Sequence, residues 1–428
     1  MSFQIPHATL SEMSRTNKEK LSSIPSVSSE RIGIKISASA EHAIKNNHPW
    51  LFARGIKHQN KEGKPGDLAV IFAKDRKFLA IGLYDPISPI RVRILAHHIP
   101  VPINEEFFHN RINTAFKIRE RLTKNTTGYR IIHGGNDKLP GLVVDRYADT
   151  FVIKLYSTAW LPHLKGILSG LESITGCQRI VLRLSRKLIK TPEFLYQLND
   201  GDILSGPPIS SPVIFQENGL WFEIDPLEGH KTGFYLDQRE NRAKVKSLAN
   251  GKKILNVFSY TGGFSIYAAS GGAKVVTSVD ISQQALNAAI KNFCLNSDHP
   301  LIRISKHKTI KGDAFKILAE LRGKNKLYDM VIIDPPSFAK DQAQVRKAIS
   351  AYQRLTRLGL NLLRKGGILV QSSCSSRVTA NDFFTAVYHG AKESGYILKE
   401  IERSNHPMDH PIRFKESAYL KCLFASVK

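Results

Sequence analysis

Short apolar runs bounded by glycine, proline or polar residues recur along the chain, and most of them are too brief for helices. Residues 253–280 are the clearest case, because they predict a buried strand, a glycine turn, a helix over Phe264–Ser270 and a second strand over Val275–Val279. The same buried-strand pattern returns at Tyr328–Asp334 and Gly366–Gln371. Strands that alternate with helices in this way predict an α/β fold with a Rossmann-like parallel sheet.

The ends of these predicted strands carry residues that suit ligand binding. Gly262 and Gly263 form a turn that a ligand can approach, Asp280 ends the second strand, and Asp334 and Cys374 follow the last two strands. Ligands of open α/β sheets lie outside the carboxyl ends of the strands, and an acid at the tip of the second strand accepts hydrogen bonds from a ribose. The missing GKS/T excludes a P-loop, and the missing GxGxxG weakens a dehydrogenase interpretation.

Longer motifs carry a family resemblance. The segments NVFSYTGGFSIYAA, VDIS, DPPSF and SSCS, in this order, resemble class I S-adenosylmethionine-dependent methyltransferases. More narrowly, HPWLF, LPGLVVDRY, GHKTGFYLDQRENR and YLK make the chain from about Arg31 onward similar to the bacterial 23S rRNA 5-methylcytosine methyltransferase family, RlmI. The resemblance implies S-adenosyl-L-methionine as cofactor, 23S rRNA as partner and an N-terminal PUA domain.

Four segments follow from composition, pattern and resemblance. Residues 1–30 hold eight serines and few large apolar residues, which predicts a disordered extension. Residues 31–104 contain short strands and predict a small β-barrel, the PUA-like RNA-binding domain of the family, with Trp50 and Phe52 in its core. Residues 105–212 are expected to form a small α/β linker domain, and residues 213–428 the class I methyltransferase domain.

The charge balance indicates the kind of partner. The 428 residues include 62 Lys and Arg against 37 Asp and Glu, a net charge of +25 that favours nucleic acid as the partner. No apolar run reaches the length of a membrane span and no secretory signal is present, so the cytoplasm is the expected compartment. Candidate phosphate contacts are Lys35, Lys45, Arg54, Lys57 and Arg91, and a strand with one solvated basic face that includes Arg179, Arg183, Arg186, Lys187 and Lys190.

Cysteine and histidine patterns argue against metal. The four cysteines are scattered without a CxxC pair, which opposes a disulfide framework and a zinc ribbon. His406, Asp409 and His410 are interrupted by prolines, so no metal site is predicted. Cys294 is expected in the core, on one helical face with Leu286, Ile290 and Phe293.

The resemblance also implies the cofactor-binding residues. Phe234, Tyr235, Gln238 and Arg239 would form a lid over the methionine end of the cofactor. Asp313 would flank the adenine or cap a helix, and both roles are compatible. Asp237 is expected to cap a helix over 238–248. The whole set is Phe234, Tyr235, Gln238, Arg239, Phe258, Tyr260, Thr261, Gly262, Gly263, Asp280, Ile281, Ser282, Asp313, Ala314, Asp334 and Pro335.

Cytosine methylation at carbon 5 needs a nucleophile, because that carbon becomes reactive only after addition to carbon 6. Cys374 suits this role as a thiolate, and Asp334 would bind the N3/N4 edge of the flipped base. Pro336 and Phe338 are expected to bind the substrate base. Ser337 stands where many RNA 5-methylcytosine enzymes carry a second cysteine, which leaves the base that removes the carbon 5 proton open, with Asp334 or a water as candidates.

Two alternatives remain open at this point. One is a methyltransferase for another rRNA position that needs no covalent catalysis, and the other is a non-catalytic RNA-binding assembly factor. The sequence also leaves open the target nucleotide, the use of naked rRNA or a particle, and a homodimer.

Overall fold

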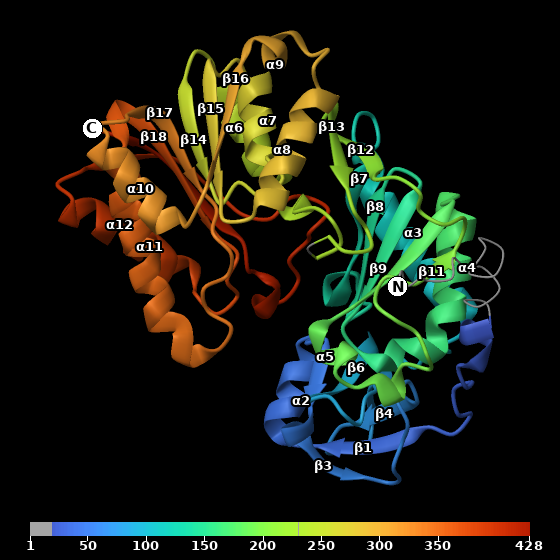
Figure 1. Ribbon diagram of the computed structural model, residues 1–428. Coiled ribbons are helices and arrows are strands. Elements are labelled where there is room, and N and C mark those ends of the chain that lie inside the picture. Colours follow the sequence, from blue (N-terminus) through green and yellow to red (C-terminus); the bar gives the residue numbers. More distant parts are fainter. Residues whose placement is uncertain (1–18, 230) are drawn as a thin grey trace, which may run out of the picture. The chain divides into compact units, whose positions relative to one another are not determined.

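The computed structural model describes residues 19–229 and 231–428 (Figure 1). The chain divides into two compact units. The first comprises the residues up to Asn218 together with Ile224–Leu236 and Met408–Arg413. The second comprises Gly219–Glu223, Asp237–Pro407 and Phe414–Lys428. None of the helices in the described part of the chain is long and apolar enough to cross a membrane.

The first unit begins with a six-stranded sheet in the order β2-β6-β5-β4-β1-β3. In this sheet β1 runs parallel to β4, and the other neighbours are antiparallel. Apolar side chains such as Ile32, Ile34, Val92 and Ile94 fill its interior. The elements are β1 (Ile32–Ile36), α2 (Ala38–Lys45), β2 (Trp50–Phe52), β3 (Ile56–Gln59), β4 (Leu68–Phe72), β5 (Phe78–Tyr84) and β6 (Ile90–His97).

A five-stranded sheet in the order β11-β10-β9-β8-β7 follows in the same unit. Its core contains Phe108 and Trp160 and also Leu83 and Leu95 of the first sheet, so one continuous core holds both sheets. The elements are α3 (Glu105–Arg119), β7 (Gly128–His133), β8 (Leu142–Tyr147), β9 (Thr150–Leu155), α4 (Leu164–Thr175), β10 (Arg179–Leu184), α5 (Arg186–Ile189), β11 (Ile203–Ser205) and β12 (Val213–Glu217). The next strand, β13 (Leu220–Ile224), belongs to the second unit except for Ile224.

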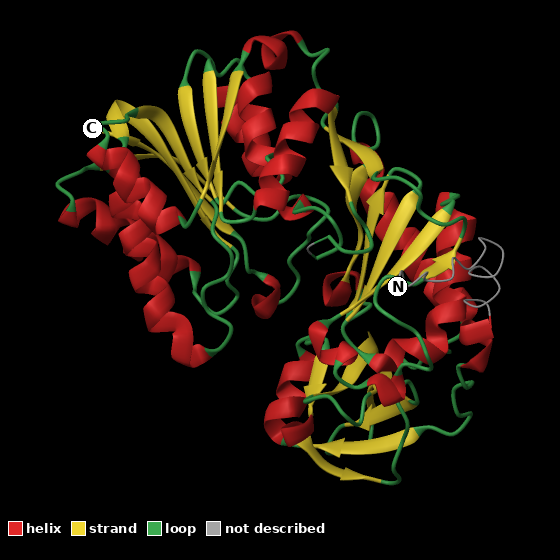
Figure 2. Cartoon of the chain, viewed as in Figure 1, coloured by secondary structure: helices red, strands yellow, loops and turns green. Residues whose placement is uncertain are grey.

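The second unit is built on a seven-stranded sheet in the order β16-β15-β14-β17-β18-β20-β19. The strands from β16 to β18 are parallel and β20 is antiparallel, with α6, α7 and α8 on one face and α10, α11 and α12 on the other (Figures 1 and 2). The elements are α6 (Arg239–Leu248), β14 (Lys253–Val257), α7 (Gly263–Ser270), β15 (Val275–Asp280), α8 (Gln283–Leu295), α9 (Pro300–Ile304), β16 (Lys306–Lys311), α10 (Ala314–Gly323), β17 (Tyr328–Ile333), α11 (Val345–Leu360), β18 (Leu363–Ser373), α12 (Ala380–Glu393), β19 (Leu398–Ser404) and β20 (Lys421–Val427).

The α/β fold and the central strands are confirmed, but several local predictions are wrong. The helix α6 begins at Arg239 and its cap, Gln238, makes no side-chain capping bond, while Asp237 instead accepts a hydrogen bond from the Tyr419 hydroxyl at 2.9 Å. Cys294 is exposed rather than buried. The buried face of α8 instead includes Asn292, whose side chain accepts from the Glu223 N–H at 2.8 Å and thereby satisfies that backbone donor.

The predicted solvated basic strand is also corrected. Arg183 is 8% exposed and binds Asp200, because its strand packs against the segment that follows it. Arg186, Lys187 and Lys190 lie on or beside α5, not on the strand.

The predictions for the two aromatic residues of β2 and for the N-terminal segment also need correction. Trp50 and Phe52 are half-buried, because β2 is an edge strand and only Leu51 faces the core. The predicted disordered extension falls partly outside the described residues, which begin at 19. Within the described part, Leu21 is buried in the core of the first unit and Lys20 pairs with Asp202, so this part is ordered.

Candidate active site

The order of strands in the second unit reverses direction between β14 and β17. From β14 the chain continues to β15 and β16 on one side, and β17 and β18 extend the sheet on the other. In open α/β sheets, ligands bind outside the carboxyl ends of the strands at such a reversal. The loop after β14, the loop after β17 and the loop after β18 all start at this edge. The predicted site residues of the second unit lie mainly on these loops.

The turn between β14 and α7 is conformationally demanding. Phe258, Tyr260 and Gly262 all have positive φ angles, of 61°, 47° and 82°. A Cβ atom on Gly262 would lie 2.8 Å from the Ala289 Cβ, so only glycine fits there. Left-handed non-glycine residues such as Phe258 and Tyr260 are costly and concentrate at functional sites. The turn presents the first N–H groups of α7, which have no partner within the helix.

Asp280 ends β15 beside this turn. Its Oδ2 accepts the Tyr260 N–H at 2.8 Å, and its Oδ1 accepts the Ser282 N–H at 2.9 Å. These two bonds fix the orientation of the half-buried carboxylate, while the neighbouring Ile281 is 70% exposed. The structure therefore brings Asp280 to the glycine turn, the arrangement expected for a ribose acceptor.

Buried polar atoms near the turn call for further partners. Asn256 Oδ1, Ser259 Oγ and Thr261 Oγ1 are buried, and none accepts or donates a hydrogen bond within the described residues. The Asn256 amide group is otherwise used, since its Nδ2 donates to Ser265 Oγ at 2.9 Å. A buried polar atom without a partner costs about 1–3 kcal/mol, and a ligand or water usually satisfies it.

Asp313 stands near Asp280. The Gly312 N–H donates to the Asp280 carbonyl oxygen at 3.0 Å, which places the following residue at the same edge of the sheet. Asp313 Oδ1 accepts the Lys316 N–H at 3.1 Å and caps α10, as the sequence predicts. Ala314 is buried at the first position of that helix.

Asp334 follows β17 and is held by two side chains. Gln238 Nε2 donates to Asp334 Oδ1 at 2.9 Å, and the Ser372 hydroxyl donates to the same oxygen. Gln238 is 3% exposed, and its Oε1 accepts from Asn241 Nδ2. These contacts orient the Asp334 carboxylate, and a place for Gln238 in a lid over the cofactor stays a prediction.

The other expected lid residues belong to different parts of the chain. Arg239 is fully buried in the second unit. Phe234 and Tyr235 belong to the first unit, where Phe234 packs on Phe215 with ring centroids 5.3 Å apart and Lys231 lies 4.3 Å from the centre of the Tyr235 ring.

Cys374 lies just after β18, next to the loop that carries Asp334. Its Sγ is 4.0 Å from the carbonyl oxygen of Pro335, and the Ser375 hydroxyl donates to the Ala339 carbonyl oxygen at 3.4 Å. Cys374 as a residue is half-buried. Two residues far apart in the sequence, Asp334 and Cys374, thus stand on adjacent loops.

The expected substrate-binding residues occupy the same loop. Pro336 is exposed, and the half-buried Phe338 ring lies 5.3 Å from the Tyr352 ring. The Tyr352 hydroxyl is hydrogen-bonded to Ser373 Oγ at 2.8 Å. Burial raises the pKa of Tyr352, and the charges of Cys374 and Asp334 raise it further, so the phenol stays protonated.

Lys421 is a site residue that the sequence analysis did not single out, although YLK is among the family motifs. Its Nζ donates to the carbonyl oxygens of Ser375 at 2.5 Å, Val378 at 2.8 Å and Tyr419 at 2.9 Å. Burial lowers the pKa of Lys421 to about 8, while the charge of Cys374 acts in the opposite direction. An amine close to the thiol therefore anchors the Cys374 loop to β20.

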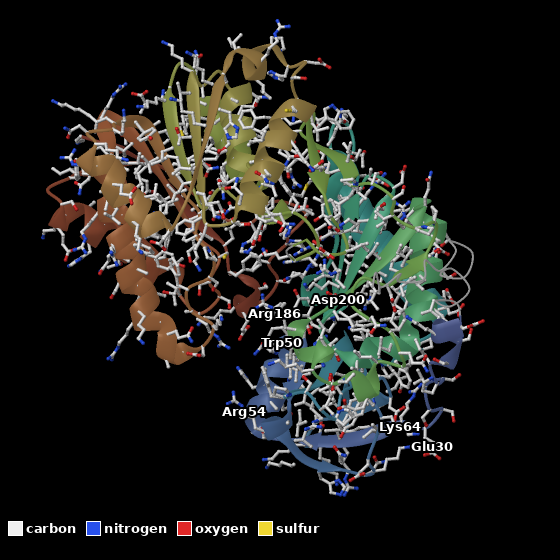
Figure 3. All side chains as sticks on the ribbon, in the orientation of Figure 1. Glu30, Trp50, Arg54, Lys64, Arg186 and Asp200 are labelled. Atoms are coloured by element: carbon white, nitrogen blue, oxygen red, sulfur yellow. The ribbon has the colours of Figure 1, made fainter. Side chains whose placement is uncertain are left out.

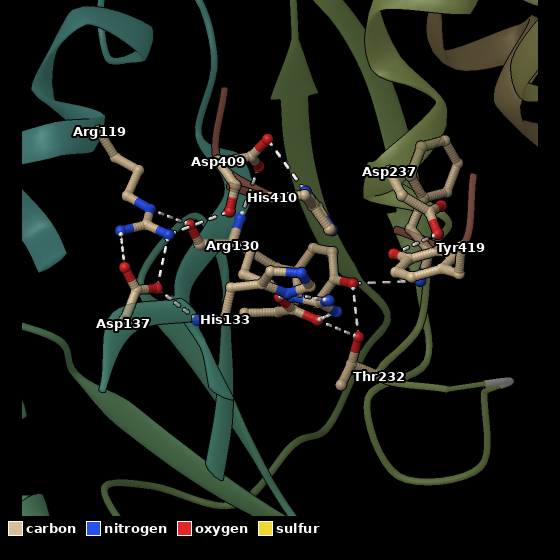
Figure 4. A network of polar contacts seen from close by, with 12 residues as sticks. Arg119, Arg130, His133, Asp137, Thr232, Asp237, Asp409, His410 and Tyr419 are labelled. Atoms are coloured by element: carbon tan, nitrogen blue, oxygen red, sulfur yellow. Dashed lines mark hydrogen bonds and ion pairs between the residues drawn. The ribbon is translucent and has the colours of Figure 1, made fainter. Parts of the chain in front are cut away.

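Two of the residues considered for metal binding, Asp409 and His410, belong to a buried polar network. Asp409 and His410, in the first unit, are hydrogen-bonded to each other at 3.1 Å, and Asp409 also accepts the Arg130 N–H at 2.9 Å (Figure 4). Within residues 19–229 and 231–428, no cluster of three or more His, Cys, Asp or Glu is placed to hold a metal ion.

Comparison with known proteins decides the family. A model of the S-adenosylmethionine-dependent methyltransferase family matches residues 130–425. The chain belongs to this methyltransferase family. A model of the PUA-like domain matches residues 34–97, which confirms the N-terminal domain type expected from the sequence.

Relatives narrow the family membership to the group recognised from the sequence motifs. A Deinococcus radiodurans protein named ribosomal RNA large subunit methyltransferase is 43% identical over 408 residues, which cover 94% of this chain and 99% of that relative. A Pseudoalteromonas translucida protein named ribosomal RNA large subunit methyltransferase I is 36% identical over 400 residues, which cover 92% of this chain and 99% of that relative. The resemblance to the RlmI methyltransferases is confirmed.

Solved methyltransferase structures share the fold. A structure described as a methyltransferase complexed with SAH has a TM-score of 0.79 to this chain, and one described as a SAM-dependent methyltransferase from Streptococcus mutans has a TM-score of 0.77. Each solved chain is 23% identical in sequence to this chain, and the match covers 92% of this chain and 100% of the solved chain.

Proposed function

We propose that this methyltransferase modifies carbon 5 of a cytosine in 23S rRNA and that Cys374 forms a covalent bond to carbon 6 of the base. The observation that supports this most directly is the placement of Cys374 and Asp334 on adjacent loops at the carboxyl edge of the sheet, where Cys374 Sγ lies 4.0 Å from the Pro335 carbonyl oxygen. A nucleophile and a base-binding acid are the two groups that this chemistry needs in one place.

The residues around the glycine turn fit S-adenosylmethionine. Asp280 is oriented to accept hydrogen bonds from ribose hydroxyls, and the buried oxygens of Ser259 and Thr261 lack partners in the described chain. The strained turn packs closely against α8, because a side chain at Gly262 would collide with Ala289. When bound, the cofactor supplies an electrophilic methyl group on a sulfonium.

Large-subunit rRNA is the substrate named for the relatives, and the charge of this chain suits it. The net charge of +25 favours binding to a polyanion. The PUA-like match at residues 34–97 adds a domain of a type that the family resemblance connects with structured RNA.

The proposed chemistry begins at Cys374. Its thiolate adds to carbon 6 of the flipped cytosine, which moves an electron pair toward carbon 5 and makes that carbon nucleophilic. Carbon 5 then takes the methyl group. Loss of the carbon 5 proton to a base returns the electron pair, and the C6–sulfur bond breaks to release the thiolate.

Asp334 would bind the N3/N4 edge of the base during addition. Gln238 and Ser372 both bind its Oδ1, so the carboxylate is held in one orientation before substrate arrives. Phe338 and Pro336, on the same loop, would contact the flipped base. Lys421 would favour the thiolate form of Cys374, because a positive charge nearby lowers the pKa of a thiol.

A mechanism-based trap tests the proposal. An RNA substrate with 5-fluorocytosine at the target should become covalently attached to the protein in the presence of S-adenosylmethionine, because fluorine cannot leave carbon 5 as a proton does. Denaturing gels and mass spectrometry would detect the adduct and locate it on Cys374. Cys374→Ala should abolish the adduct and methylation and leave cofactor binding intact.

The other cysteines provide matched controls. Cys177→Ala, Cys294→Ala and Cys422→Ala should each retain adduct formation. An adduct that persists in Cys374→Ala would assign the nucleophile elsewhere. Full methylation by Cys374→Ala would instead support transfer to an rRNA position that is already nucleophilic, without a covalent intermediate.

A further inference from the structure

Positively charged side chains from three distant segments gather in the first unit. Arg111 on α3 donates to the carbonyl oxygen of Leu95 at 3.3 Å. Leu95 lies two residues before His97 in the sequence. The Arg413 N–H donates to Asn136 Oδ1 at 2.8 Å. Asn136 lies two residues before Lys138 in the sequence. Lys138 and Arg413 are exposed, and Arg111 is half-buried. We call His97, His98, Arg111, Lys138 and Arg413 the cationic patch.

The charges of the cationic patch act on one another. Burial lowers the pKa of Lys138, and the charges of Arg111 and Arg413 lower it further. Burial also lowers the pKa of His97, the hydrogen bond to the His48 carbonyl oxygen opposes this shift, and the charges of His98, Lys138 and Arg111 lower the pKa further. Mutual repulsion of this kind is relieved when an anion binds.

The acid next to Lys138 in the sequence is already engaged elsewhere. Asp137, which precedes Lys138, is buried and paired with Arg119 at 2.7 Å. Neither Lys138 nor Arg413 forms an ion pair with a residue in the described ranges, 19–229 and 231–428. The cationic patch thus offers exposed positive charge to an external anion.

An aromatic surface adjoins the cationic patch. His97 Nε2 donates to the His48 carbonyl oxygen at 3.1 Å, and the Trp50 N–H donates to His48 Nδ1 at 3.3 Å. The His48 and Trp50 rings meet edge to face with centroids 5.5 Å apart. Trp50 is half-buried on the edge strand β2, and the exposed Arg54 follows it along the chain (Figure 3).

The backbone at this surface is strained in three places. Asn47, His98 and Lys138 have positive φ angles of 60°, 67° and 60°. His98 Nε2 donates to Asn47 Oδ1 at 3.2 Å and so holds two of these residues together. Left-handed conformations cost energy for residues with side chains, and they persist where the surrounding structure demands a particular placement.

We infer that the cationic patch and Trp50 form a binding site for single-stranded RNA, with phosphates on Arg111, Lys138 and Arg413 and a base stacked on Trp50. Lys and Arg bind phosphates, and an aromatic ring stacks on a base only when that base is unpaired. A duplex would present phosphates but no exposed base face. The inference deepens the proposed function, since the bound strand would be part of the rRNA substrate.

The test uses the full chain without S-adenosylmethionine and a fluorescent single-stranded RNA of about 12 nucleotides. Lys138→Ala with Arg413→Ala should reduce the slope of log Kd against log salt by about 1.4, because each lost phosphate contact contributes about 0.7. Lys117→Ala with Lys165→Ala, which removes two exposed lysines outside the patch, should change the slope far less. Trp50→Ala should weaken binding about 5- to 100-fold.

Control variants make the outcome decisive. Trp221→Ala, at a tryptophan that is 42% exposed in the second unit, should leave RNA affinity near that of the wild type. Equal slope losses in the two double variants would overturn the phosphate site. Equal effects of Trp50→Ala and Trp221→Ala, or an equal effect of Trp50→Ala on an RNA duplex, would overturn base stacking.

Methylation of rRNA by the wild type is measured in parallel. Normal methylation together with unaffected RNA binding by the patch variants would overturn this inference alone. If the wild type fails to methylate rRNA while the patch variants bind RNA more weakly than the wild type, the result would count against the proposed function and would leave the RNA site supported.

Discussion

The backbone N–H of Tyr260 donates to Asp280 Oδ2 at 2.8 Å, which ties the strained turn after β14 to the acid that ends β15. A second bond, from the Ser282 N–H to Oδ1, leaves the carboxylate with little rotational freedom. Pre-orientation of this kind lowers the entropy cost of binding a ribose. The consequence can be measured as cofactor affinity.

Asp280→Ala should weaken S-adenosylmethionine binding about 5- to 150-fold, since a charged acceptor for ribose hydroxyls is worth about 1–3 kcal/mol. Calorimetric titration measures the change. Asp298→Ala, at an exposed acid in the same unit, serves as the control and should bind the cofactor normally. Unchanged affinity in Asp280→Ala would show that another residue holds the ribose.

Gln238→Ala should slow methyl transfer about 10- to 100-fold, because Asp334 loses a 2.9 Å hydrogen bond that orients its carboxylate. Gln238→Glu should be slower still, since it places a second carboxylate against Asp334. Single-turnover methylation with saturating cofactor measures the rate, and Gln283→Ala, on the exposed side of α8, is the matched control. Equal rates in Gln238→Ala and the control would exclude the supporting role.

Lys421→Met should raise the pKa of the Cys374 thiol, because it removes a positive charge and the anchor of the Cys374 loop. The pH dependence of alkylation by iodoacetamide reports this pKa in a variant whose other three cysteines are serine. We expect alkylation at pH 7 to fall about tenfold. Lys421→Arg keeps the charge and should restore part of the reactivity, and an unchanged pH profile in Lys421→Met would refute the electrostatic role.

His307 should make the stability of the second unit depend on pH. Burial lowers the pKa of His307 from 6.5 to about 4, so between these values the unfolded chain binds more protons than the folded chain. The stabilisation from the neutral ring is complete above pH 6.5 and is lost as the pH falls toward 4, by roughly 1–3 kcal/mol.

Thermal unfolding at a series of pH values tests the His307 effect. His307→Gln should flatten the decline in melting temperature between pH 6.5 and 4, whereas His389→Gln, at an exposed position of the same unit, should retain it. A wild-type slope in His307→Gln would mean that other groups cause the decline.

The local sequence pattern was sufficient to predict the strands whose ends are expected to bind the cofactor. The apolar runs before Gly262, Asp280 and Asp334 predicted β14, β15 and β17, because a strand buried on both faces needs a short continuous apolar segment. The cap at Asp313 was also predictable, since its bond to the Lys316 N–H spans only three residues. The family motifs indicated the identity of the cofactor, which composition and periodicity alone could not indicate.

Predictions based on one face of a helix or strand were less successful. Periodicity placed Cys294 in the core, but Asn292 of α8 and Asn296, which follows the helix, are buried instead, because these amides hydrogen-bond to the backbone of Trp221 and Glu223. Arg183 was expected in solvent, but it pairs with Asp200. A polar residue that is buried by a specific partner leaves no signature in the hydrophobic pattern.

By itself, the sequence determined the α/β class, the glycine turn, the acids at the strand ends and the basic character of the chain, because each depends on residues that are close together or on composition. Only the tertiary structure decided that Gln238 supports Asp334, that Lys421 anchors the Cys374 loop and that Arg413 binds Asn136. These pairs are separated by tens to hundreds of residues, and their contacts arise from strand order and packing, which no local pattern encodes.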